Sequence, residues 1–190
     1  MKYLVSIILA GAVLAPLQAR AGDPPAINQP QAFADSPSYS GIYLRGDIGA
    51  SYLNWGSASA PWAYVGQAGL GYQFDQNFRT DLTYDWSGNY GVAPSGNVST
   101  NIVLLNGYYD WKNQSAFTPY VGAGAGYGWE NASGLGAVNA QGVAVGFAAG
   151  VAYDMNRNLA LDVGYRFHDI LNSAQTTPEH QVAVGLRVKF

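Results

Sequence analysis

Apolar and polar side chains alternate with a period of two along most of the chain from residue 41 onward. In the segment Leu159–His168, every odd position is apolar or aromatic, whereas the even positions include Asp162 and Arg166. The segment His180–Phe190 repeats this alternation up to the last residue. Successive side chains of a β-strand point to opposite faces, so the pattern predicts strands with one apolar and one polar face.

Eight such segments are expected, each long enough to cross a bilayer as a tilted strand of about 9–11 residues. An even number of strands is usual for single-chain bacterial barrels. We therefore predict an all-β fold, an eight-stranded antiparallel up-and-down transmembrane β-barrel. The expected strands are Ile42–Asn54, Ala63–Phe74, Phe78–Trp86, Thr100–Trp111, Thr118–Trp129, Gln141–Asp154, Leu159–His168 and His180–Phe190.

A soluble β-sandwich also alternates, but its apolar face is the core and its charges face water. A membrane barrel instead turns polar residues inward and apolar residues towards lipid. Aromatic residues near the strand ends favour the barrel, because they predict a girdle at each membrane interface. One girdle is expected to contain Tyr52, Tyr64, Tyr84, Trp86, Tyr127, Trp129, Tyr165 and Phe167. The other is expected to contain Tyr72, Phe74, Phe78, Tyr109, Trp111, Tyr153 and Phe190.

The connections between the expected strands also alternate in length. Tight connections are expected at Asp75–Asn77, Lys112–Phe117 and Met155–Asn158. Longer connections, mostly rich in Gly, Ser and Asn, are expected at Trp55–Trp62, Ser87–Ser99, Glu130–Ala140 and Asp169–Glu179. Short periplasmic turns and long outer loops are typical of outer-membrane barrels, so both chain ends are expected on the periplasmic side.

Composition agrees with this fold class. Charged residues make up 11% of the chain, against roughly 25% in an average soluble protein. The chain contains 24 glycines, which argues against a helical protein. The absence of cysteine excludes disulfides, Cys-ligated zinc and thiol catalysis, and the net charge of -3 with no Lys/Arg-rich stretch excludes nucleic-acid binding.

The N-terminus has the features of a cleavable export signal. Lys2 supplies a positive charge, Tyr3–Leu17 is apolar, and Ala19 and Ala21 form a small-x-small cleavage site before Gly22. The apolar run is shorter than the roughly 20 residues of a membrane-spanning helix. We therefore expect a signal peptide at residues 1–21, a Pro-rich periplasmic leader at 22–40 and the barrel at 41–190.

Four segments resemble the small porin-like outer-membrane proteins of alphaproteobacteria, a barrel family of the OmpA-like, opacity-protein type. These segments are Gly41–Gly49, Thr118–Tyr127, Leu161–Phe167 and His180–Phe190. The resemblance implies a multi-pass bacterial outer-membrane protein whose neighbours are outer-membrane lipid and lipopolysaccharide. It also implies that periplasmic chaperones and the barrel-assembly machinery, which reads a terminal residue such as Phe190, act on the chain.

The inward face is expected to carry a balanced set of charges. An eight-stranded barrel is just wide enough for side chains to fill, and buried charges must pair. We therefore expect a structural charge network in the lumen. Its expected members are Arg45, Asp47, Arg79, Asp81, Asp110, Asp162, Arg166 and Arg187, with Asp85 and Lys189 also facing inward. The network is expected to plug the bore, and an ion path or gate is the alternative.

The inward residues of the outer half are small. They are Gly49, Ser51, Gly69, Gly124, Gly126, Ala144 and Gly146. A narrow vestibule would follow from their size. Alternatively, the glycines only permit the strong coiling of a small barrel.

The two histidines, His168 and His180, are expected at the outer rim. With Ser173 and Glu179 nearby, they permit one alternative, an acyl-transfer site like that of lipid A deacylases. That chemistry requires a base oriented by an acid within reach of the serine. The serine here lies in a loop, so rim polar residues are the favoured interpretation, and two histidines alone are a weak metal site.

The main functional expectation is a non-enzymatic surface protein without a cofactor. It would contribute to envelope integrity and make adhesive or ligand contacts through its outer loops. A narrow porin for small solutes and a lipid A-modifying enzyme are the alternatives. Such barrels carry several functions, so the fold by itself does not choose among them.

Overall fold

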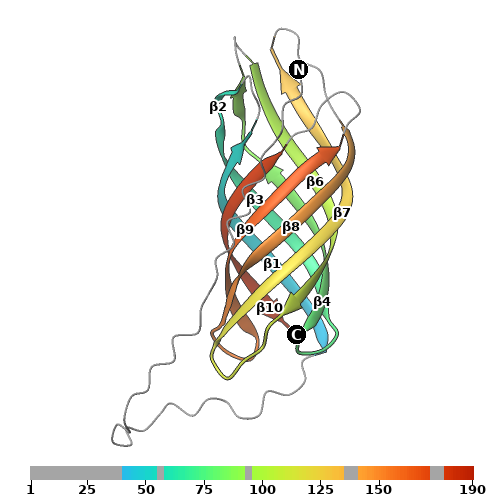
Figure 1. Cartoon of the computed structure of the whole chain (residues 1–190), viewed down its shortest axis with the longest axis vertical. Coiled ribbons are helices and arrows are strands. Elements are labelled where there is room, and N and C mark those ends of the chain that lie inside the picture. The colour runs from blue at the N-terminus through green and yellow to red at the C-terminus, as the bar shows by residue number, and fades with distance from the viewer. Residues whose placement is uncertain (1–39, 55–57, 93–95, 135–140, 172–177) are drawn as a thin grey trace, which may run out of the picture. The chain divides into compact units, whose positions relative to one another are not determined.

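The computed structural model describes residues 40–54, 58–92, 96–134, 141–171 and 178–190 (Figure 1). The expected signal peptide and all but the last residue of the expected leader lie outside these residues. Within them, no helix is long and apolar enough to cross a membrane. The strands are β1 (Gly41–Leu53), β2 (Ala58–Ala60), β3 (Trp62–Gln73), β4 (Phe78–Ser87), β5 (Tyr90–Val92), β6 (Gly96–Asp110), β7 (Phe117–Ser133), β8 (Gln141–Asp154), β9 (Leu159–Leu171) and β10 (Glu179–Lys189).

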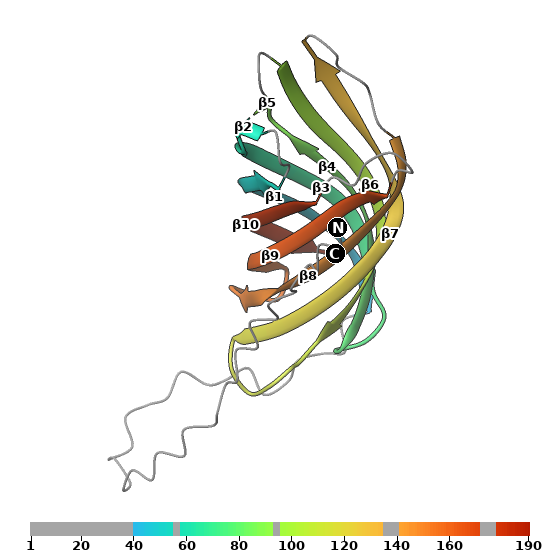
Figure 2. The ribbon, with the colours of Figure 1, turned by 45° about the horizontal axis from the view of Figure 1, so that its top comes forward.

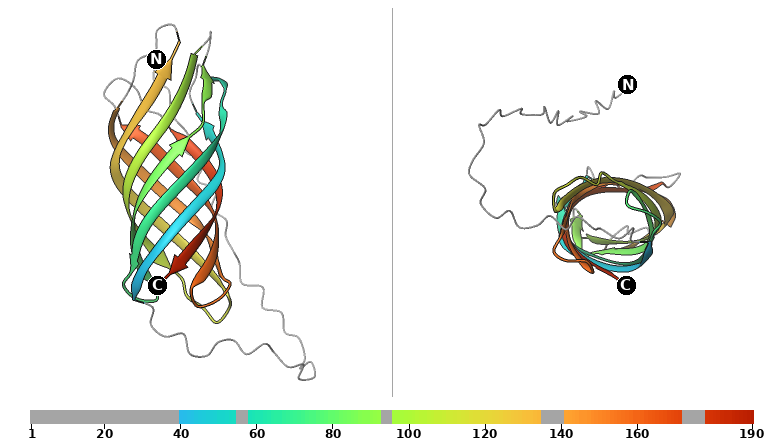
Figure 3. Two further views of the ribbon diagram at one scale, coloured as in Figure 1. Left: turned by 180° about the vertical axis from the view of Figure 1, so that it is seen from behind. Right: turned by 90° about the horizontal axis from the view of Figure 1, so that it is seen from below.

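Eight long strands form a closed antiparallel ring. Each of them pairs with two neighbours in the order β6-β4-β3-β1-β10-β9-β8-β7, and the β6–β7 pairing closes the ring (Figure 3). The first strand therefore pairs with the last, with Ile48 opposite Val184. Closure leaves no sheet edge with unpaired backbone groups, which a bilayer does not tolerate. The predicted eight-stranded barrel is confirmed.

Side chains alternate between the lumen and the outer surface as the sequence pattern predicts. In β9, Val163 is 47% exposed, whereas the neighbouring Asp162 is only 4% exposed. Aromatic residues of both expected girdles face outward, and Tyr72 and Phe74 pack edge to face there. The polar side chains therefore form the interior of this barrel, and the apolar ones form its exterior.

One end of the barrel carries short turns and the C-terminal Phe190, and we call it the short-turn end. Its turns contain side-chain to backbone hydrogen bonds. Asp75 Oδ1 accepts hydrogen bonds from the backbone N–H groups of Asn77 and Phe78, and Asn156 Oδ1 accepts the equivalent pair in the β8–β9 turn. Asp and Asn favour such turns because their side chains bond to backbone two or three residues further on.

The opposite end carries the four longer connections, and we call it the loop end. Here the strands extend further than predicted. β6 begins at Gly96, β7 continues to Ser133 and β9 continues to Leu171, all within segments that were expected to be loops. The Gly/Ser/Asn content suggested loops, but pairing such as Asn97 with Ser133 continues the backbone ladder. The expected loop boundaries at this end were therefore wrong.

Two short strands also lie at the loop end. β2 and β5 pair with each other, and β5 pairs with the first residues of β6 (Figure 2). Tyr90 of β5 is fully buried, so this connection sends a side chain into the barrel. The sequence pattern predicted neither strand, because three residues are too few to show a period of two.

Candidate functional site

The polar lumen is the candidate functional site, and it contains every residue of the expected charge network. All eight are at least 94% buried, because the alternation of their strands turns them inward. The ion pairs among the network residues, with Asp85, are Arg45–Asp47, Arg45–Asp81, Arg79–Asp81, Arg79–Asp110, Arg166–Asp47, Arg166–Asp85, Arg187–Asp110 and Arg187–Asp162.

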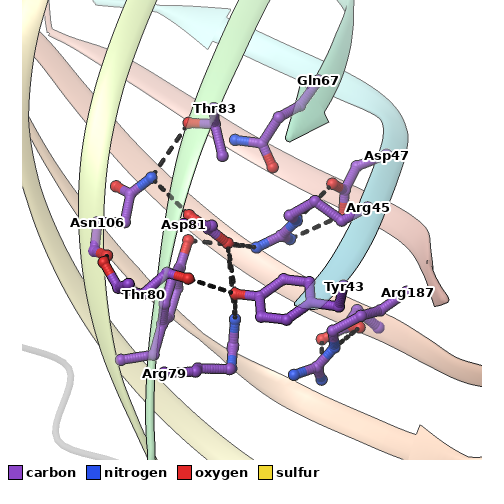
Figure 4. Close-up of polar contacts among 12 residues, drawn as sticks. Tyr43, Arg45, Asp47, Gln67, Arg79, Thr80, Asp81, Thr83, Asn106 and Arg187 are labelled. Carbon is purple, nitrogen blue, oxygen red and sulfur yellow. Dashed lines mark hydrogen bonds and ion pairs between the residues drawn. The ribbon is translucent and has the colours of Figure 1, made fainter. Parts of the chain in front are cut away.

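Arg45 of β1 lies between two carboxylates. Its Nε and Nη2 atoms donate to the two oxygens of Asp47, each at 3.0 Å, and its Nη1 donates to Asp81 of β4 at 3.2 Å. Nη1 also donates to the Tyr108 hydroxyl at 3.2 Å. Figure 4 shows Arg45 and Asp47 of β1 close to Asp81 of β4. A fork-shaped guanidinium with two acceptors on Asp47 is a geometry that fixes both partners.

Arg79 of β4 is the most enclosed cation. Its Nε lies 3.1 Å from both oxygens of Asp110, and its guanidinium carbon lies 3.8 Å from the centre of the Tyr108 ring. Among the described residues, its Nη2 atom has no hydrogen-bond partner. The aromatic faces of Tyr108 and Tyr120 therefore contribute cation–π contacts to this guanidinium.

The lumen tyrosines were not anticipated from the sequence. Tyr43, Tyr108 and Tyr120 all point inward, and the Tyr43 hydroxyl donates to Asp81 at 3.0 Å. The alternation of inward and outward positions could have identified Tyr43 as an inward residue, because it lies two positions before the inward Arg45. Glycines on neighbouring strands leave space for the rings, because a Cβ at Gly71 would clash with the Tyr43 ring.

Two ion pairs join strands on opposite sides of the ring. Arg166 of β9 lies 3.9 Å from Asp85 of β4, and Arg187 of β10 lies 3.9 Å from Asp110 of β6. Arg187 also holds Asp162 of the adjacent strand at 3.1 Å. Charged side chains therefore reach across the bore at two positions.

A smaller charged group lies at the short-turn end. Asp154 accepts from Lys112 at 2.7 Å and from Lys189 at 3.3 Å. Lys189 was expected to face inward, and it is half-buried at the barrel mouth. These three residues join the ends of three strands where the barrel meets its turns.

A second polar cluster lies inside the barrel near the loop end, and it centres on Glu179. Its Oε1 accepts from Ser51 at 2.7 Å and from Tyr90 at 2.6 Å, and its Oε2 accepts from Thr100 at 2.9 Å. Burial and the neighbouring Glu179 carboxylate raise the pKa of Tyr90 well above its ordinary value. Glu179 was expected in a loop, but it is the first residue of β10 and is 1% exposed.

The small residues expected to leave a vestibule have larger neighbours. Ala144 packs with Ile102, Leu104 and Ile170 in an apolar cluster inside the barrel. Ser51 belongs to the Glu179 cluster. The loop half of the lumen therefore contains buried aliphatic and polar side chains that the sequence pattern did not bring together.

The two histidines point to opposite faces of the sheet. His168 faces the lumen, is 3% exposed and lies 3.3 Å from Gln181. His180 faces outward, and its Nδ1 lies 2.6 Å from the Tyr165 hydroxyl. The period-two alternation gives His168 the polar face of β9 and His180 the apolar face of β10, and both lie near the loop-end limits of these strands. Ser173 lies outside the described residues.

A closed barrel with a polar interior and an aromatic exterior defines the class, an integral outer-membrane β-barrel protein. Residues 7–190 match the family model described as outer membrane protein beta-barrel domain, and the chain belongs to this family. The resemblance noted from the sequence is therefore confirmed at the level of the family. The bacterial outer membrane is the location of the protein.

Three similar proteins add detail. Neisserial surface protein A has a similar structure, with a TM-score of 0.67 and 25% identity over 80% of this chain and 98% of that chain. The outer membrane protein PagN of Salmonella typhimurium is 28% identical over 130 residues, 49% of this chain and 54% of that protein. A putative adhesin of Rickettsia bellii is 33% identical over 115 residues, 50% of each chain.

Proposed function

We propose that this protein is a non-enzymatic surface barrel whose lumen is plugged by its charge network and whose loop end contacts partners outside the cell. The proposed plug rests on two ion pairs between strands on opposite sides of the ring, Arg166–Asp85 and Arg187–Asp110. A bore only wide enough for side chains is obstructed when charged groups from opposite walls meet inside it.

The loop end is proposed to face the outside. Long outer loops and short periplasmic turns are the usual arrangement in this class. The four connections at residues 54–61, 88–95, 134–140 and 172–178 contain no charged residue. A partner of these loops would therefore be recognised through hydrogen bonds and apolar contacts, and a polyanion would find no Lys or Arg there.

A surface role is supported by the relatives. One of them is described as a putative adhesin, and another is a surface protein of similar structure. We extend adhesion or ligand contact to this chain as part of the proposal. Its neighbours would be outer-membrane lipid and lipopolysaccharide, and its export would depend on cleavage before Gly22, on periplasmic chaperones and on the barrel-assembly machinery.

The positions of the histidines support a non-enzymatic role. Acyl transfer from a lipid needs a base and an acid on the face that the lipid reaches. His168 and Glu179 face the lumen, whereas His180 faces outward and pairs with Tyr165. The two histidines therefore do not form a joint acid–base site for a lipid substrate.

Planar-bilayer recording tests the plug. Wild-type protein is expected to show no steady conductance, and the double variant Arg166→Ala with Arg187→Ala is expected to produce channel openings because it removes both ion pairs that cross the bore. Tyr165→Ala with Leu186→Ala is the matched control, since these are the adjacent residues and they face outward. Stable conductance of the wild-type protein would favour the narrow porin instead.

Attachment assays test the surface role. A deletion strain is complemented with wild-type protein or with a variant whose four loop-end connections are replaced by Gly-Ser segments of equal length. The loop variant is expected to insert normally and to lose attachment. Equal attachment by both strains would contradict the proposal, and a change in lipid A mass in the deletion strain would favour the enzyme.

A further inference from the structure

Glu179 is a buried carboxylate among oxygen atoms. Ser51, Tyr90 and Thr100 place hydroxyl oxygens 2.6–2.9 Å from it, and Ser87 places a further hydroxyl 2.9 Å from Thr100. These groups come from β1, β4, β5, β6 and β10, so the cluster draws together strands from opposite sides of the ring. The only nitrogen in the described contacts of Glu179 is the side-chain amide of Gln181, at 3.0 Å.

No cation neutralises Glu179 within the described part of the chain. The ion pairs found there include no contact to this carboxylate within 4.0 Å. Every Lys and Arg of the barrel lies either in the lumen network or at the short-turn end. A buried carboxylate without a counter-charge is costly, so this one needs a positive partner from outside the chain or a bound proton.

The hydroxyl protons are too few for the oxygen contacts. Glu179 Oε1, Ser51 Oγ and Tyr90 Oη lie within 2.6–2.7 Å of one another. Three contacts among these oxygens share two hydroxyl protons when the carboxylate is ionised. One pair of oxygens then presents lone pairs to each other, and a cation that binds both oxygens from one side would convert that repulsion into coordination.

Two further oxygen-bearing side chains point into this part of the barrel. The Oε1 atom of Gln181 is buried and has no hydrogen-bond partner in the described residues, although the nitrogen of the same amide bonds to Glu179. Glu130 is 5% exposed and is the register partner of Thr100. A buried amide oxygen without a partner among the described residues therefore adjoins the Glu179 cluster, and Glu130 lies on the strand next to Thr100.

We propose that this cluster is a binding site for a hard divalent cation, with Ca²⁺ as the preferred ion. Carboxylate, hydroxyl and amide oxygens suit Ca²⁺, whereas Zn²⁺ prefers nitrogen and sulfur. Ca²⁺ also accepts flexible geometry with six to eight oxygen ligands, whereas Mg²⁺ usually keeps several waters. The Glu179 carboxylate supplies a negative charge at the centre of this oxygen cluster.

Calcium bound here would tie Glu179 of β10 to Thr100 of β6 on the opposite side of the ring. It would also hold β5 in place through Tyr90. The site thus stabilises the loop end, from which the connections project. This inference does not depend on the plug, because it involves none of the arginines of the lumen network.

The test uses the full chain folded in detergent without lipopolysaccharide, so that calcium held by lipopolysaccharide does not contribute. After chelation, calorimetric titration with CaCl₂ is expected to show one site per chain. The thermal unfolding midpoint is expected to rise with Ca²⁺ concentration, because a ligand that binds only the folded state stabilises it. MgCl₂ and NaCl at matched ionic strength are expected to raise the midpoint less.

Glu179→Gln is expected to weaken Ca²⁺ binding at least about tenfold, as loss of a group at a metal site does. Ser51→Ala removes a single hydroxyl and is expected to weaken binding as well, which keeps the test valid if the first variant folds poorly. Asp154→Asn, at the short-turn end, is the matched control and should retain wild-type affinity. Tb³⁺ luminescence sensitised by tyrosine gives a second readout, expected to fall in Tyr90→Phe.

The proposal is overturned if the chelated protein shows no calorimetric binding and no Ca²⁺-specific rise in midpoint. It is also overturned if Glu179→Gln and Ser51→Ala both bind Ca²⁺ as the wild-type protein does. Neither result bears on conductance, so the failure of this site and the failure of the plugged lumen are separable.

Discussion

Single residues in the lumen are held by charge pairing and hydrogen bonds more than by apolar packing. Arg187 shows this most simply, because it forms a two-point contact with Asp162 of the adjacent strand at 3.1 and 3.3 Å. Both side chains are almost fully enclosed. Removing one member of such a pair leaves the other charge buried and uncompensated, which is costlier than removing both.

Arg187→Met is therefore expected to lower the free energy of unfolding by about 3–5 kcal/mol. The double variant Arg187→Met with Asp162→Leu is expected to recover much of this loss, because no lone carboxylate remains. Urea unfolding in detergent, followed by tryptophan fluorescence, measures both variants. A double variant that is no more stable than the single one would show that the two residues do not act as a pair.

Tyr90 makes stability depend on pH at the loop end. The pKa of its hydroxyl is raised in the folded protein, so the folded state binds this proton more tightly than the unfolded state does. The resulting stabilisation is complete below the unfolded pKa of about 10 and is lost as pH rises above it. In the Ca²⁺-free protein, the free energy of unfolding is expected to fall above about pH 10, and to fall less in Tyr90→Phe. Parallel curves for the two proteins would contradict this linkage.

Each long strand has one face towards lipid and the other face towards the polar lumen. The turn chemistry at the short-turn end sets where β4 and β9 begin, through Asp75 and Asn156. At the loop end, the described ladder between β6 and β7 continues to the pair Asn97 and Ser133. Turn hydrogen bonds therefore mark the strand starts at the short-turn end, and strand pairing extends β6 and β7 at the loop end.

The facing of β9 gives a prediction at this scale. Val163 faces outward near the middle of its strand, and its register partners Val151 and Val184 do the same. Val163→Arg would place a cation against lipid and is expected to cost about 2–4 kcal/mol of folding free energy. Folding yield into lipid vesicles measures the effect, with Val163→Leu as the control. Equal yields for the two variants would mean that this face of β9 does not contact lipid.

Closure of the ring is a property of the whole molecule, and it rests on the pairing of β1 with β10. Because the chain has no cysteine, one introduced pair can report this register without competition. Register partners in antiparallel strands have Cα atoms about 4.5–5.5 Å apart, within disulfide range. Ile48 and Val184 are such partners, and both face outward.

Ile48→Cys with Val184→Cys is expected to form an intramolecular disulfide under mild oxidation. The bond should change mobility in non-reducing electrophoresis of the unfolded chain. Ile48→Cys with Leu186→Cys, displaced by two residues, is the control and is expected to cross-link poorly. Efficient cross-linking of the displaced pair instead would indicate another register for the closing strands.

The barrel, the facing of its side chains and the inward position of the charged residues can be predicted from the sequence alone. These features follow from local rules: a period of two sets the face, and Asp and Asn mark turns. Arg45 and Asp47 could be assigned to the lumen because each lies at a polar position of an alternating strand. Tyr43, Tyr108 and Tyr120 also lie at inward positions of this alternation. Tyrosine is both apolar and polar, so its residue type did not show which face it occupies.

The contacts between inward residues across the bore depend on how the strands are arranged in the closed ring. Strands in a closed barrel are tilted and staggered, so residues at equal depth lie at different positions along each strand. That offset accumulates around the ring, and no single segment encodes it. It brings Glu179, which was expected in a loop, to Thr100 on the opposite side of the barrel. Contacts across the bore, including the proposed cation site, therefore arise from closure of the ring.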